Sequence, residues 1–96
     1  MDETKKEQTN EQFTEMCKAL GHPIRFAIIE FLMSHPSCIT GDIVDVLPVA
    51  QSTTSQHLKI LKAAGWIQGT IEGTASCYCL NREHVQWFKE AVKDLL

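Results

Sequence analysis

Residues 50–67 constrain the fold of this chain more than any other segment, because they predict a helix with two chemically different faces. Thr54, Leu58 and Leu61 recur at helical spacing and form a stripe that can pack on a core. The opposite face has no acidic residue and carries Ser52, Ser55, Gln56, Lys59 and Lys62. Hydroxyls, amides and a helix N-terminus suit base edges and phosphates. We interpret the segment as a DNA-recognition helix, with helix capping and a solvated surface as the alternative for the two serines.

The neighbouring segments predict a mainly α-helical fold with a small β-hairpin, arranged as a winged helix-turn-helix with an extra helix at each end. One DNA-binding and dimerisation domain is expected at residues 10–96, after a flexible arm at residues 1–9. The expected elements are helices at about 13–20, 22–34 and 41–47, a short extended piece at 38–40, the recognition helix to Gly65, strands at 66–71 and 75–80, and a last helix from about Arg82.

The length and net charge of the chain limit the classes of protein to which it can belong. The chain has 96 residues and a net charge of −3, so it is one small domain and one copy should bind DNA weakly. The acids crowd residues 2–15, whereas residues 50–71 hold two lysines and no acid. No apolar stretch is long enough for a membrane span and the start is charged, which predicts a cytoplasmic protein with no membrane partner.

Two stretches resemble the ArsR/SmtB family of bacterial metal- and metalloid-responsive repressors. The first is Lys18–Arg25, with the sequence KALGHPIR, and the more specific one is Gln51–Leu58, with the sequence QSTTSQHL. Ala64–Ile67 and Tyr78 in the wing extend the resemblance to roughly residues 16–81. The resemblance implies a non-enzymatic repressor that binds double-stranded operator DNA and leaves it when an inducer binds. It also implies a homodimer formed through the first and last helices.

The resemblance also assigns DNA contacts by position. The residues that would approach base edges are Gln51, Ser52, Ser55 and Gln56. The DNA backbone would be contacted mostly by Thr53, His57, Lys59, Lys62 and the wing tip near residues 70–74. Thr54 departs from the family, which usually has a small apolar residue there, so its hydroxyl should need a partner. Glu72 puts an acid in the wing, where a DNA contact would favour arginine.

Two effector sites known in the family do not fit this sequence. A Cys-x-Cys site before the third helix would need cysteines where Ile39 and Gly41 stand. A zinc site across the last helices could use His84, but Arg82 and Leu95 occupy positions that need ligands. The protein is therefore expected to have no constitutive cofactor.

Three other cysteines are predicted to converge. If residues 38–40 pair with the second wing strand, Cys38 lies on the same face as Cys77 and Cys79. Three thiolates suit As(III) or Sb(III), which predicts a repressor released by such an effector. Packing alone and a redox switch, in which Cys38 pairs with Cys77 or Cys79, remain open. Other classes are a winged-helix module for protein interaction and a thiol enzyme, for which no motif is present.

Overall fold

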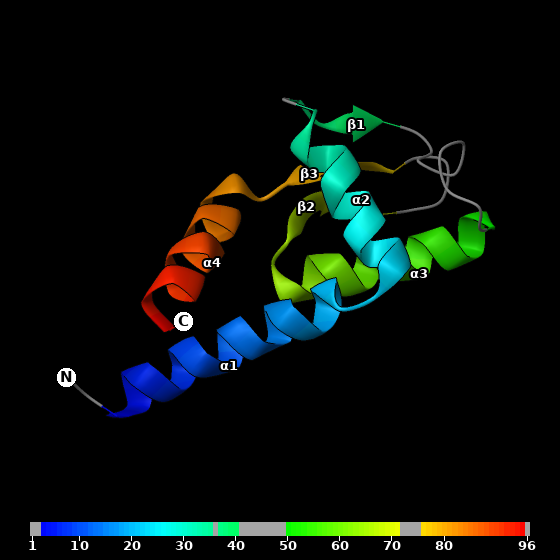
Figure 1. The fold of residues 1–96 in the computed structure, drawn as a ribbon. Helices are drawn as coiled ribbons and strands as arrows, with labels where there is room; N and C mark the ends of the chain where they lie inside the picture. The colour runs from blue at the N-terminus through cyan, green and yellow to red at the C-terminus, as the bar shows by residue number, and fades with distance from the viewer. Residues whose placement is uncertain (1–2, 36, 41–49, 72–75, 96) are drawn as a thin grey trace.

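The computed structural model describes residues 3–35, 37–40, 50–71 and 76–95. The helix expected at 41–47 and residues 72–74 of the wing tip, Glu72 included, lie outside these residues. The elements in chain order are α1 (Glu3–Leu20), α2 (Pro23–Met33), β1 (Ile39–Thr40), α3 (Gln51–Ala64), β2 (Ile67–Thr70), β3 (Cys77–Leu80) and α4 (Arg82–Leu95) (Figure 1). This mainly helical arrangement with a small sheet confirms the predicted winged helix-turn-helix with a helix added at each end. No helix in the described ranges has the length and apolar character that a membrane crossing requires.

Helices α1 and α2 meet at a sharp corner. Helix α1 ends just before Gly21, whose N–H donates a hydrogen bond to the Cys17 carbonyl at 3.0 Å. His22 then caps α2, because its Nδ1 accepts from the Ile24 N–H, and Pro23 follows in the first turn, where a missing N–H costs nothing. Helix α1 begins at Glu3, so most of the segment expected as an arm is helical.

The three strands form an antiparallel sheet in the order β1-β3-β2. Ile39 pairs with Tyr78 between β1 and β3, and Ile67 pairs with Leu80 between β2 and β3. The pairing of the short first strand with the second wing strand is therefore confirmed.

Both wing strands are shorter than predicted. Gly65 adopts a left-handed conformation (φ 97°), and the Trp66 N–H bonds back to the Leu61 carbonyl at 3.0 Å. Trp66 thus belongs to the helix ending rather than to the strand. The regular pairing ends at Thr70 and Cys77, which leaves Ile71 and Ser76 beyond the strands.

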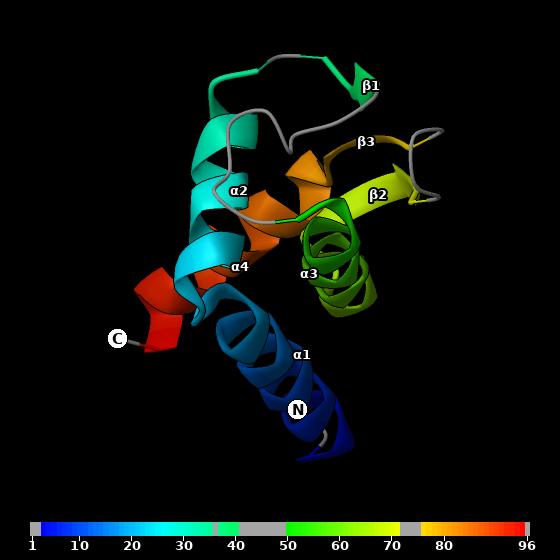
Figure 2. The same cartoon turned by 90° about the vertical axis from the view of Figure 1, so that its right-hand side faces the viewer.

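A single core joins α1, α2, α3, the sheet and α4 (Figure 2). The Trp66 indole lies at its centre and donates from Nε1 to the Met16 carbonyl at 2.8 Å. The largest fully buried side chains are Tyr78, Met16, Ile28, Leu32 and Leu61. Packing in this core holds α3 in position against the other elements.

Candidate functional site

Helix α3 has the two faces that its sequence predicts. Thr54, Leu58 and Leu61 are buried and attach the helix to the core. The outer face exposes Ser52, Thr53, Gln56, Lys59 and Lys62, with Ser55 and His57 half-buried. Gln51 begins the helix. An exposed face with two cations and no acid can accept a polyanion.

Within the described residues, no side chain caps the start of α3. Its N-cap is Ala50, which makes no side-chain hydrogen bond, and the first turn has no acidic residue. Ser52 lies within the helix rather than at its cap, so the capping explanation for this serine is wrong. Uncapped N–H groups at a helix start favour an anion such as a DNA phosphate.

Among the described residues, the Thr54 hydroxyl does not have the partner that was expected. Thr54 is only 2% exposed, and no group in the described part of the chain bonds to its Oγ1. Thr54 faces the core, where its neighbours Leu58 and Leu61 offer no hydrogen-bonding groups. Its methyl group does the packing that an apolar residue would do.

The side chain of His57 on α3 lies against two other basic side chains, Arg25 and His22. The Arg25 Nη1 lies 3.3 Å from Nδ1 of His57, and the rings of His57 and His22 lie 4.5 Å apart. Burial, followed by the positive fields of His22 and Arg25, lowers the pKa of His57 below its ordinary 6.5. Sequence reasoning placed His57 at the DNA backbone but gave no signal for this cluster, because Arg25 and His57 are 32 residues apart.

The cysteines gather on the outer face of the sheet. Cys38 and Cys79 are joined in a disulfide, with their Cα atoms 4.3 Å apart. Cys77 is exposed and not in a disulfide, while Tyr78 and Leu80 point into the core. The predicted alternation is confirmed, and of the two partners considered for Cys38, the structure selects Cys79.

Cys77 stands apart from the bonded pair. It lies across from Thr40, one diagonal step from Cys38, and diagonal neighbours in a sheet are separated by about 7–8 Å between Cα atoms. Within the described ranges, no three His, Cys, Asp or Glu side chains are grouped so that they could hold a metal ion. The structure therefore brings two of the three predicted sulfur ligands into contact.

An open cleft of about 370 Å³ adjoins the disulfide. Gln68 lines one wall, with its Nε2 4.0 Å from the Cys79 sulfur. Arg82 lines another and donates from Nη2 to the His35 carbonyl at 2.9 Å. Small reagents in solvent can therefore reach the sulfur atoms.

The residues at the family's zinc positions have other partners. His84 Nδ1 lies 2.9 Å from the Gly65 carbonyl, and Arg82 is bonded to His35. His84 thus ties α4 to the end of α3.

Comparison with known proteins decides the family. Residues 22–68 match the family described as bacterial regulatory protein, arsR family. The chain is also 38% identical over 85 residues to the arsenical resistance operon repressor of Bacillus subtilis, covering 88% of this chain and 80% of that protein. The chain belongs to the ArsR family. This is a family of transcription regulators and not of enzymes, which excludes the thiol-enzyme alternative.

Two further relatives are also named as transcription regulators. An HTH-type transcriptional regulator of Methanocaldococcus jannaschii is 35% identical over 85 residues, covering 88% of this chain and 96% of that protein. The transcriptional repressor SmtB of Mycobacterium tuberculosis is 42% identical over 71 residues, covering 74% of this chain. The chain spans about half the length of SmtB (52%).

The same fold occurs in a solved ArsR-like transcriptional regulator from Rhodococcus sp. RHA1. The two structures superpose with a TM-score of 0.73, covering 92% of this chain and 82% of that chain at 18% identity. At this identity the likeness establishes the shared fold alone.

Proposed function

We propose that this ArsR-family protein is a cytoplasmic transcriptional repressor that binds double-stranded operator DNA through α3. The observation that carries the proposal is the exposed face of α3, where Ser52, Gln56, Lys59 and Lys62 follow one another from the first turn, which has no acid, to the last. Ser52, Ser55 and Gln56, with Gln51 before them, read base edges. Thr53, Lys59 and Lys62 contact the DNA backbone, whereas the half-buried His57, expected there from the sequence, is held by Arg25.

The repressor works as a homodimer through α1 and α4. The chain carries a net charge of −3, so one recognition helix supplies little attraction and two are needed. The two helices already pack together within one chain, with the Phe13 and Phe88 rings stacked at 5.1 Å. Leu95 near the end of α4 is 50% exposed and would be covered by a second copy. The mass in solution by light scattering tests this assembly.

Thiol chemistry at Cys38 and Cys79 releases the DNA. Cys38 directly precedes β1, and β1 is followed in sequence by the segment that leads into the recognition helix. A bond from Cys38 to β3 therefore ties the entry of the helix-turn-helix to the wing. Couplings of this kind typically change affinity by about 5–150-fold.

Two kinds of reagent can link Cys38 to β3, a metalloid ion and an oxidant. The trihydroxide of As(III) or Sb(III) would exchange its hydroxides for the sulfurs of reduced Cys38, Cys77 and Cys79, whose thiol protons leave with the hydroxides as water. The similarity to an arsenical resistance operon repressor supports this effector. An oxidant would instead remove two electrons and two protons from Cys38 and Cys79, and the bonded pair of sulfurs supports this second candidate.

Release from DNA distinguishes the two effectors. The reduced protein is bound to its own promoter fragment and titrated in parallel with arsenite, zinc and a mild oxidant. Release by arsenite alone supports the metalloid sensor, and release by oxidant alone supports the disulfide switch. Cys38→Ser should stay bound in both titrations, whereas Cys17→Ser, which changes an exposed cysteine on α1, should respond like the parent. Unchanged release of Cys38→Ser would refute both.

Salt dependence separates a repressor from the protein-interaction alternative. The logarithm of the affinity for phosphates falls linearly with the logarithm of the salt concentration, because binding releases counterions. A promoter fragment that is not retained even at low salt would favour the interaction module.

A further inference from the structure

The four histidines differ in what their Nδ1 atoms can do. His35 Nδ1 faces the Phe31 carbonyl at 2.7 Å and His84 Nδ1 faces the Gly65 carbonyl at 2.9 Å. A carbonyl oxygen only accepts, so both rings donate from Nδ1. An imidazolium donates from Nδ1 as well, and these two contacts therefore persist when the rings are protonated.

His22 and His57 have the opposite requirement. The Ile24 N–H donates to Nδ1 of His22 at 3.1 Å, and the Arg25 guanidinium, which has no acceptor, faces Nδ1 of His57 at 3.3 Å. Each Nδ1 must therefore carry a lone pair rather than a proton. Both contacts need neutral rings, and the two rings lie against each other at 4.5 Å.

Arg25 links this pair to the body of the protein. Its Nε donates to the Ala19 carbonyl and its Nη2 lies 3.5 Å from the Lys18 carbonyl, so it caps the end of α1. Its Nη1 then reaches His57 on α3. One side chain thus connects the corner between α1 and α2 with the recognition helix.

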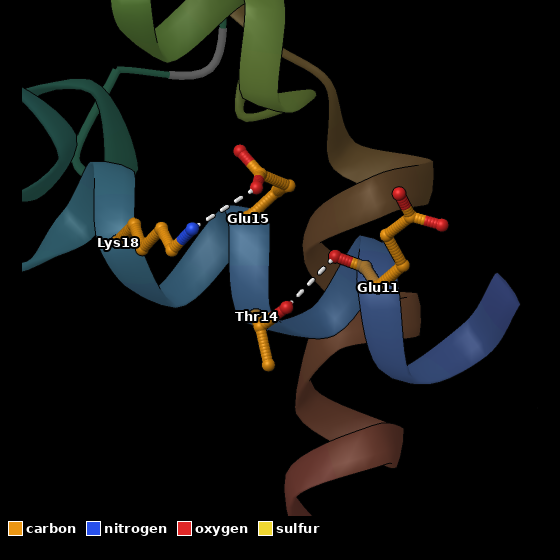
Figure 3. Close-up of polar contacts among 4 residues, drawn as sticks. All are labelled: Glu11, Thr14, Glu15 and Lys18. Atoms are coloured by element: carbon orange, nitrogen blue, oxygen red, sulfur yellow. Dashed lines mark hydrogen bonds and ion pairs between the residues drawn. The ribbon is translucent and has the colours of Figure 1, made fainter. Parts of the chain in front are cut away.

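Within the described residues, the charged groups that act on His57 are both basic. The groups that act on it are His22 at the corner and Arg25 on α2. The ammonium of Lys18 on α1 forms an exposed ion pair with Glu15 on the same helix, at 3.4 Å (Figure 3). Close by on α1, the Thr14 hydroxyl donates to the Glu11 carbonyl. Glu15 lines one cleft together with Arg25, but within the described ranges no carboxylate is hydrogen-bonded to Arg25, His22 or His57.

We propose that Arg25 is a positioning residue of the recognition helix, holding α3 through Nδ1 of His57, and that this hold lasts only while His57 is neutral. Protonation of His57 removes the acceptor and sets a second cation against the guanidinium. Helix α3 then loses its link to the corner between α1 and α2. The effect on DNA rests on the proposed operator binding, because it changes where α3 presents its outer face.

The test compares affinity for the promoter fragment at pH 7.5 and pH 5.5 at constant ionic strength. We expect the parent protein to lose about fivefold or more of its affinity on acidification. In His57→Gln, the amide oxygen can still accept from Arg25 and does not titrate, so the ratio of the two affinities should approach one. His84→Gln is the matched control and should keep the ratio of the parent. A parent affinity that is constant, or that rises in acid, would overturn the proposal.

A second measurement does not depend on DNA. The ring signals of His57 and the backbone amide signals of α3 are followed by NMR from pH 7.5 to 5. The α3 amides should shift with the same midpoint as the His57 ring, and this response should be absent in His57→Gln. Amides of α3 that ignore the titration would refute the proposal even if DNA binding itself fails, which separates it from the proposed function.

Discussion

The indole Nε1 of Trp66 donates to the Met16 carbonyl across 50 residues of sequence, at 2.8 Å and away from solvent. Trp66 follows the glycine that ends α3, and Met16 lies on the buried face of α1. The bond therefore fixes the C-terminal end of the recognition helix to the helix expected at the dimer interface. The Arg25–His57 contact and the bond from Gln12 Nε2 to the Ala64 carbonyl, at 3.1 Å, also attach α3 to the α1–α2 part of the molecule.

Replacing Trp66 with Phe should lower the free energy of unfolding. The variant loses a buried hydrogen bond and part of a core side chain, which together cost about 2–4 kcal/mol. Urea unfolding followed by circular dichroism measures the change. The half-buried Trp87 provides a control, and Trp87→Phe should cost clearly less. Equal losses in the two variants would contradict a special role for the Trp66–Met16 bond.

Replacing Thr54 with Val should raise the free energy of unfolding by about 1 kcal/mol. The change keeps the shape of the side chain and removes a buried hydroxyl whose desolvation is not offset in the described part of the chain. Urea unfolding again supplies the measurement. A loss of stability would mean that the hydroxyl has a partner that Val cannot replace.

Stability should fall in acid through His57. Because the pKa of His57 is lowered in the folded state, the unfolded chain binds this proton more readily. The contribution of His57 is therefore complete above its ordinary value of 6.5 and is lost as pH falls through the lower folded-state pKa. The free energy of unfolding measured between pH 7.5 and 5 should decline less in His57→Gln than in the parent. Parallel declines in the two proteins would contradict the lowered pKa.

Lys59 and Lys62 should account for part of the salt dependence of DNA binding. Each replacement by Gln should reduce the slope of log affinity against log salt by about 1 per protomer, because one phosphate contact is lost. Fluorescence anisotropy with a labelled promoter fragment at several salt concentrations provides the slope. Lys93→Gln changes an exposed lysine on α4 and should leave the slope unchanged. A slope that is insensitive to both α3 lysines would remove them from the interface.

Local patterns predicted most of the fold. The apolar spacing in α3, the Gly21 and Gly65 endings and the Pro23 start are short-range signals, and each is found at the expected place. Alternation in the second wing strand also predicted which of its residues face inward. The error at Trp66 arose because a hydrogen bond of the helix ending took a residue that alternation assigned to a strand.

The sequence by itself determined the order of the elements, the two faces of α3 and the shared face of the three cysteines, because these follow from the helical and strand periods. The tertiary structure alone decided that Cys38 pairs with Cys79 and not with Cys77, since that choice depends on the register between β1 and β3. It also decided that Arg25 and His22 meet His57. Such contacts join residues far apart in the chain, and only the packing of α1, α2 and α3 around one core sets the distances between them.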